Sequence, residues 1–169
     1  NKFFKTSFAA PPLINGLLKN GDLDAGINYW NYVARLEGQG FKRILSIEDI
    51  LPILGINGDL PLIGYVFKED LLLEDYDLVK RFLDATNEAR RILEESDKEW
   101  NRIMSLTGAE DTEMLVAIRN GFRKGIPKSN REILNNNIIK AYDILKDIGG
   151  KNLVGQGKHL AKGTIWNAN

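Results

Sequence analysis

Residues 20–40, NGDLDAGINYWNYVARLEGQG, decide the fold that the sequence predicts. Residues 23–28 place Leu, Ala and Ile at every second position, which is the alternation of a β-strand. The string YWNY (residues 29–32) follows, and a helical pattern begins at about the same place. We therefore interpret this stretch as a strand that passes into a helix, with three aromatic side chains at the junction.

The flanking sequence repeats this mixed character. Pro11 and Pro12 suit the first turn of a helix, and Gly21 is placed to end it. Residues 31–39 form the expected helix after the aromatic junction, with Gly40 as its left-handed terminator. Two further strands are predicted at residues 42–47 (KRILSI) and 62–67 (LIGYVF), and the second strand has the composition of one buried on both faces.

From Asp75 onward the sequence is helical. A long amphipathic helix is expected after Asp75, and a capping box at residues 96–99 opens the next helix. Another helix begins at Asp111 or Thr112, and a second capping box at residues 129–132 precedes a helix that ends at the Gly149-Gly150 pair. The final twenty residues are expected to be irregular.

Composition excludes several classes of function. The 169 residues contain 23 Lys and Arg against 23 Asp and Glu, so no net charge would attract nucleic acid. No stretch approaches the ~20 apolar residues that span a bilayer. The absence of cysteine excludes disulfides, thiolate metal sites and a cysteine nucleophile.

Evidence for catalysis is equally sparse. The single histidine, His159, lies in a glycine-rich segment where a solvated side chain is expected. The glycines near the C-terminus lack the strand-loop-helix order and the Lys-Ser/Thr ending of a phosphate-binding loop. No spacing of His or carboxylates indicates a metal site. We expect a non-enzymatic protein with no catalytic residues, no metal and no cofactor.

The aromatic junction itself has two interpretations. Ligands of α/β proteins collect where strands end and helices begin, so Asn28 and Asn31 could bond a polar ligand while Trp30 or Tyr29 stacks on it. Alternatively, Trp30 anchors the helix to the sheet and Tyr32 lies on the surface. Composition alone slightly favours the packing interpretation.

The predicted strands are too few for the helices that would cover them. Three or four strands make a marginal sheet, and the apolar strand at residues 62–67 needs neighbours that the chain does not supply. We expect the neighbouring strands to lie upstream of Asn1, in a preceding part of the same protein.

An ordered series of segments resembles a known family. The series comprises AAPPLINGLLKNGDLDAGINYWNYVARLEGQG (residues 9–40), LGI, PLIGYVF, a long helix, SDKEW, RNGFRKGIP, GGKNLVG and GTIW. It is similar to the C-terminal part of ABC-transporter substrate-binding proteins of the nitrate/sulfonate/taurine type, a family that also includes binders of thiamine precursors. The likeness extends over nearly the whole chain.

The resemblance implies an α/β fold of the type II periplasmic-binding-protein class, a two-lobe clamp of which this chain is the C-terminal, helix-rich part. Residues 1–57 would end the second, inserted lobe, and residues 58–169 would return to the first lobe. The implied partners are a small-molecule solute, an ABC permease in the membrane and the missing N-terminal half of the same protein. The implied location is periplasmic or extracytoplasmic, with a lipid anchor as one variant.

The resemblance also implies the site. Candidates are the turn before the first helix, the aromatic junction, and a tyrosine near the crossover between lobes. By residue they are Ala9, Ala10, Pro11, Asn28, Tyr29, Trp30, Asn31 and Tyr65. A helix N-terminus favours an anionic group, although Pro11 and Pro12 lack N–H donors.

The expected function is therefore solute binding for an ABC importer. The solute would be small, polar or anionic and organic, and it would be held in a cleft between two lobes that close about a hinge. Two alternatives stay open: a sensor or interaction module, and an enzyme of pyrimidine-precursor synthesis on the same fold.

Overall fold

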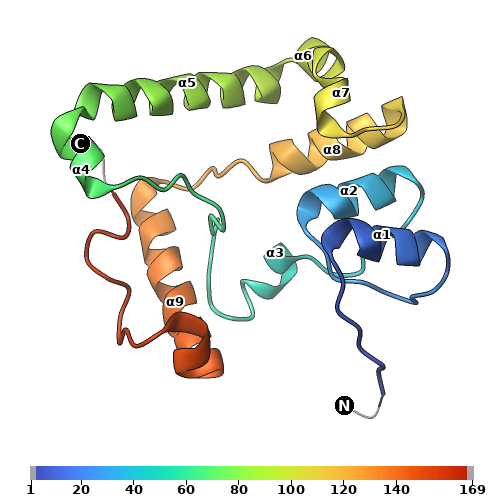
Figure 1. Ribbon diagram of the computed structural model, residues 1–169, viewed down its shortest axis with the longest axis horizontal. Coiled ribbons are helices and arrows are strands. Elements are labelled where there is room, and N and C mark those ends of the chain that lie inside the picture. The colour runs from blue at the N-terminus through green and yellow to red at the C-terminus, as the bar shows by residue number, and fades with distance from the viewer. Residues whose placement is uncertain (1–2, 167–169) are drawn as a thin grey trace. The chain divides into compact units, whose positions relative to one another are not determined.

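The computed structural model describes residues 3–166, and within that range every regular element is a helix (Figure 1). The helices, in chain order, are α1 (Pro11–Lys19), α2 (Trp30–Gly38), α3 (Ile47–Ile50), α4 (Glu69–Glu74), α5 (Tyr76–Glu95), α6 (Asp97–Arg102), α7 (Met104–Thr107), α8 (Thr112–Lys124) and α9 (Arg131–Val154).

The predicted fold class is wrong. Residues 3–166 contain no strand and no sheet, so the structure is not the α/β two-lobe clamp of the type II periplasmic-binding-protein class. A strand is stable only when its backbone N–H and C=O groups pair with a neighbour. Apolar alternation in the sequence indicates which side chains would share a face of a strand. It does not show whether a neighbouring strand is present.

Each predicted strand has a different structure. Residues 23–28 form a loop, and residues 41–46 are non-helical chain that leads into α3. Ser46 and Asp49 form a capping box at the start of α3, with the Ser46 N–H donating to the Asp49 carboxylate over 2.8 Å. Residues 62–67 have no regular structure, and Ile63 and Val66 are 83% and 96% exposed where burial was expected.

Several of the predicted helices are confirmed, because the start of a helix depends on local signals. The helices that begin at Pro11 and after Asp75, Ser96 and Asp111 are confirmed as α1, α5, α6 and α8. The Asp75 and Asp111 carboxylates and the Ser96 hydroxyl each accept a bond from a backbone N–H in the first turn, which is how these residue types stabilise a helix N-terminus.

The chain divides into two compact units. The first comprises residues 1–44 and 69–126, and the second comprises residues 45–68 and 127–169. Each unit therefore combines two separate stretches of sequence. The boundary predicted between residues 57 and 58 separates the two lobes of the family that the sequence resembles, and it stays a prediction.

The first unit has a core built around α2, α6 and α8. Its buried side chains are Ala34, Trp100, Met114, Leu115 and Ile118. The Trp100 indole meets the Phe122 ring edge-on, with 5.3 Å between the ring centroids, and its Nε1 donates to the carbonyl oxygen of residue 93 over 2.7 Å. The hydrogen bond orients the buried indole within the core, and the ring also buries a large apolar area.

Helices α2 and α8 form a close antiparallel pair within this unit (Figure 1). Gly38, at the end of α2, lies against Met114 near the start of α8. At the other end, Gly121 of α8 faces the Trp30 ring and the Ala34 side chain of α2. Glycine at these positions lets the two backbones approach because no Cβ separates them.

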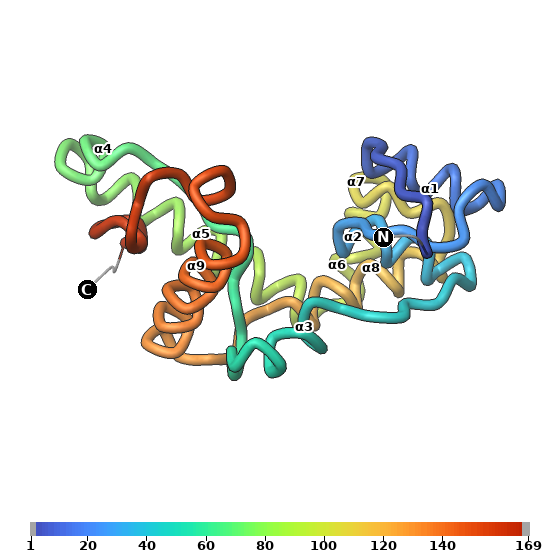
Figure 2. The backbone as a smooth tube through the Cα atoms, turned by 90° about the horizontal axis from the view of Figure 1, so that it is seen from below, coloured from blue at the N-terminus to red at the C-terminus, as the bar shows by residue number. Residues whose placement is uncertain are grey.

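The second unit is organised by α9. Asn137 on α9 is 7% exposed and donates to the carbonyl oxygens of Asn57 and Asp59 over 2.8 and 2.9 Å. The chain after α9 turns back along the helix (Figures 1 and 2), and the Tyr142 hydroxyl and the Lys146 ammonium bond carbonyl oxygens of this returning segment.

Two details of α9 differ from the prediction. The residue that caps its N-terminus is Asn130, whose side-chain oxygen accepts from the Ile133 N–H, whereas Ser129 of the predicted capping box bonds Asp59. The Gly149-Gly150 pair does not end the helix. Instead Gly150, with φ of 57°, kinks it, and helical chain continues to Val154.

Candidate functional site

The predicted aromatic junction lies at the N-terminus of α2. Tyr29 is 69% exposed and Trp30 is 43% exposed, so both rings stand at the surface. The Trp30 ring lies close to Gly121 of α8, where an added Cβ would come within 3.2 Å of the ring. We use the name aromatic turn for Asn28, Tyr29, Trp30 and Asn31.

The start of α2 carries open hydrogen-bond donors. Tyr29 occupies the N-cap position and its side chain makes no capping bond. The Tyr32 and Val33 N–H groups bond back to the Tyr29 carbonyl oxygen over 3.0 Å. The preceding N–H groups of Trp30 and Asn31 have no partner within the helix, as is usual for a first turn. Asn31, the second residue of α2, is half-buried.

Asn28 makes three hydrogen bonds within the first unit, and its role in solute binding stays a prediction. Its Nδ2 donates to the Pro11 carbonyl oxygen over 2.8 Å and to Asn15 Oδ1 over 2.9 Å, while its Oδ1 accepts from the Tyr29 N–H over 2.9 Å. Asn15 Nδ2 in turn donates to the Tyr32 carbonyl oxygen. The sequence analysis missed Asn15; its signal is an amide in the apolar run LINGLL.

The turn before α1 is joined to this network. Ala10 is the N-cap of α1 and offers no side-chain bond, and its carbonyl oxygen accepts from the Leu13 and Ile14 N–H groups. Ala9 and Pro11 are half-buried, and Ala10 is exposed. The bond from Asn28 to Pro11 therefore ties the predicted turn to the aromatic turn, and these seven candidates all belong to the first unit.

Tyr65, the eighth candidate, belongs to the second unit. It is 62% exposed within the non-helical segment that was expected to be a buried strand. Its role in solute binding stays a prediction.

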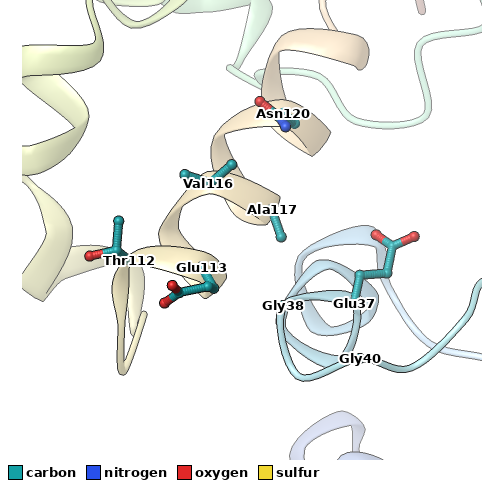
Figure 3. Close-up of a pocket in the computed structure, with 8 residues that line it drawn as sticks. All are labelled: Glu37, Gly38, Gly40, Thr112, Glu113, Val116, Ala117 and Asn120. Atoms are coloured by element: carbon teal, nitrogen blue, oxygen red, sulfur yellow. The ribbon is translucent and has the colours of Figure 1, made fainter.

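A groove runs between α2 and α8 (Figure 3), and the sequence analysis did not foresee it. Its volume is about 540 Å³, which falls within the range of roughly 300–1,000 Å³ that is usual for ligand sites. Figure 3 shows one wall formed by α8 and the other by the end of α2. The lining residues are Glu37, Gly38, Gly40, Thr112, Glu113, Val116, Ala117 and Asn120.

The charged groups of this groove have structural roles. Glu37 forms a two-point ion pair with Arg43, with N to O distances of 2.7 and 3.0 Å. Glu113 lies in the first turn of α8, where a carboxylate stabilises the helix N-terminus. The groove therefore offers an apolar floor of Val116 and Ala117 with little polar chemistry directed into it.

Residues 3–166 contain no group of three His, Asp or Glu side chains that could hold a metal ion. The pKa of the Asp59 carboxyl group is lowered by the Ser129 hydroxyl and then by the N–H groups of Ser129 and Lys128. These bonds join two segments of the second unit and form no cleft.

Neither a scan of protein-family models nor a search of curated proteins finds a match to this chain. Within residues 3–166, no helix combines the length and the apolar character needed to cross a membrane.

Proposed function

We propose that this chain is the solute-binding component of an ABC importer, or a part of one, and that it binds its solute at the aromatic turn. The solute is a small polar or anionic organic molecule. The proposal does not include closure of two α/β lobes around a cleft, since residues 3–166 form no sheet. A membrane permease receives the solute, and the protein works in the periplasm or outside the cytoplasm.

One observation carries the proposal. Tyr29 and Trp30 lie exposed at a helix N-terminus without a side-chain cap, and Asn31 is the next residue of that helix. Large exposed aromatic rings favour stacking on a planar or aliphatic ligand, while an amide and open N–H groups supply hydrogen bonds that fix its orientation. We infer a role in transport from the series of segments that resembles substrate-binding proteins.

The test is a titration of the protein with small solutes of three chemical classes. Taurine represents the sulfonates, a pyrimidine the heterocycles, and spermidine the amines. We expect one class to raise the melting temperature and to give saturable heat in calorimetry. Failure of every class to bind at millimolar concentration would remove solute binding as the function.

A second candidate, a protein-interaction module, is favoured by a separate observation. Ile63 and Val66 are almost fully exposed in a non-helical segment, and exposed apolar side chains of this size are often covered by another protein. Binding of a solute would support the first candidate, whereas self-association through residues 62–66 without solute binding would support the second.

A further inference from the structure

We propose that Asn15 is a positioning residue for the aromatic turn, acting through Asn28 to hold Tyr29 and Trp30 in the orientation that receives the solute. The inference rests on the proposed solute binding at this turn. The contacts that carry it belong to α1, α2, α8 and the loop between the first two helices, all within the first unit.

The amide of Asn15 bonds the chain on either side of Trp30 and Asn31. Asn15 is 7% exposed and lies on α1, among side chains that are otherwise apolar. Its Nδ2 donates to the Tyr32 carbonyl oxygen and its Oδ1 accepts from Asn28 Nδ2, each over 2.9 Å. A leucine would match its size, but it would leave the Asn28 N–H without this acceptor and the Tyr32 carbonyl oxygen with only its bond inside α2.

The amide of Asn28 makes three hydrogen bonds within the protein. Both of its N–H groups donate, to Pro11 and to Asn15, and its oxygen accepts from the Tyr29 N–H. Only this orientation of the amide satisfies the three partners, because the Pro11 carbonyl accepts and the Tyr29 N–H donates. Asn28 therefore orients the turn and leaves solute contact to Tyr29, Trp30 and Asn31.

The two amides bond the backbone on either side of Trp30 and Asn31. Asn28 binds the backbone at Tyr29, and Asn15 binds it at Tyr32, so Trp30 and Asn31 lie between two fixed points. The Trp30 ring is supported from the other side by Gly121. Loss of the amides frees the backbone that carries the indole, while the packing of α2 on α8 is kept.

Asn137 provides a matched control for this role. It is also 7% exposed and also makes two hydrogen bonds, in which its Nδ2 donates to the carbonyl oxygens of Asn57 and Asp59. It belongs to the second unit and makes no bond to the aromatic turn. Asn137→Leu therefore imposes a comparable loss of buried hydrogen bonds without touching the turn.

The experiment compares Asn15→Leu with Asn137→Leu in the ¹⁵N-labelled protein. The indole N–H signals of the three tryptophans are recorded, and the signal of Trp30 is assigned with Trp30→Phe. We expect Asn15→Leu to shift or broaden the Trp30 indole signal while the Trp100 signal stays in place. Asn137→Leu should leave the Trp30 signal unchanged.

Solute affinity is the second measurement, made with taurine or with whichever tested solute binds the unsubstituted protein. Asn15→Leu should weaken binding roughly fivefold, which corresponds to the loss of about 1 kcal/mol from one hydrogen bond. Adding Asn28→Ala to Asn15→Leu should weaken binding little further, because both changes break one network. Asn137→Leu should bind as the unsubstituted protein does.

The outcomes separate the two proposals. An unchanged Trp30 signal in Asn15→Leu, or an equal shift in Asn137→Leu, overturns the positioning role. If no solute binds but the Trp30 signal moves selectively, the network stands and solute binding fails. Should Asn15→Leu lose its dispersed spectrum, Asn28→Ala at the half-buried end of the network makes the same comparison.

Discussion

A Cβ atom on Gly38 would lie 2.6 Å from the Cα atom of Met114. The positions of both atoms are set by the backbone, so no side-chain rotation can relieve this clash. We expect Gly38→Ala to force α2 and α8 apart and to lower the free energy of unfolding by about 1–3 kcal/mol, the usual cost of overpacking. Urea denaturation followed by circular dichroism measures the change.

The control for this substitution is Gly16→Ala on α1, where a Cβ would meet no heavy atom within 4 Å. Alanine is the better helix former by about 0.5–1 kcal/mol, so this variant should be slightly stabilised. Equal stability of the two variants would contradict the close approach of α2 and α8.

Asp59 should make the second unit sensitive to acid. Three donors from Ser129 and Lys128 lower the pKa of its carboxyl group below the ordinary value of 3.8. Because the folded pKa is the lower one, the stabilisation is fully present above the unfolded pKa and is lost as the pH falls below about 4. Asp59→Asn should remove about 1–3 kcal/mol at neutral pH.

The measurement is the free energy of unfolding of both proteins between neutral pH and pH 3. The difference between the unsubstituted protein and Asp59→Asn should shrink as the pH falls. Asp24→Asn, at an exposed carboxylate in the loop after α1, should have little effect on stability. A difference that stays constant with pH would show that the Asp59 charge does not stabilise the fold.

Trp30 should contribute to solute affinity by stacking. Trp30→Ala removes the exposed indole, and we expect binding to weaken roughly threefold to tenfold, as the loss of an aromatic contact usually does. The control is Trp166→Ala, which removes an indole that meets Phe67 edge-on in the second unit. Unchanged affinity in Trp30→Ala would exclude Trp30 from the site.

Two valines of opposite exposure test the conformation of residues 62–67. Val66 is 96% exposed, so Val66→Lys should change the free energy of unfolding by less than about 0.5 kcal/mol. Val79, on α5, is 4% exposed, so Val79→Lys should destabilise the protein by several kcal/mol because it buries a charge.

The same Val66→Lys variant tests the interaction module. Light scattering after gel filtration should show less self-association than in the unsubstituted protein, because the apolar surface is interrupted by a charge. Strong destabilisation by Val66→Lys would mean that the side chain is covered, against its exposure in the structure.

The helices could be predicted because their signals are local. Asp75, Ser96 and Asp111 each cap a helix through a bond to an N–H group three residues later. The strands could not be predicted in the same way. Residues 62–67 have the apolar and β-branched composition of a strand, but a strand also requires a partner, which no local pattern specifies.

The candidate site shows the same limit. The sequence identified the aromatic residues at the start of α2, whose exposure depends on how α2 packs against α8. It assigned Asn28 to the solute, but it did not predict the bonds of that amide to Pro11, Asn15 and Tyr29. Asn15 went unnoticed because its partners, Asn28 and Tyr32, are distant in sequence.

The open segment at residues 62–66 has a consequence for proteolysis. Proteases bind extended backbone, so this segment should be cleaved before the helices are. The resulting fragments would nevertheless stay together, since α2 packs on α8 in one unit and Asp59 bonds Ser129 in the other. A single cut would thus yield a nicked particle that separates into two peptides only under denaturing conditions.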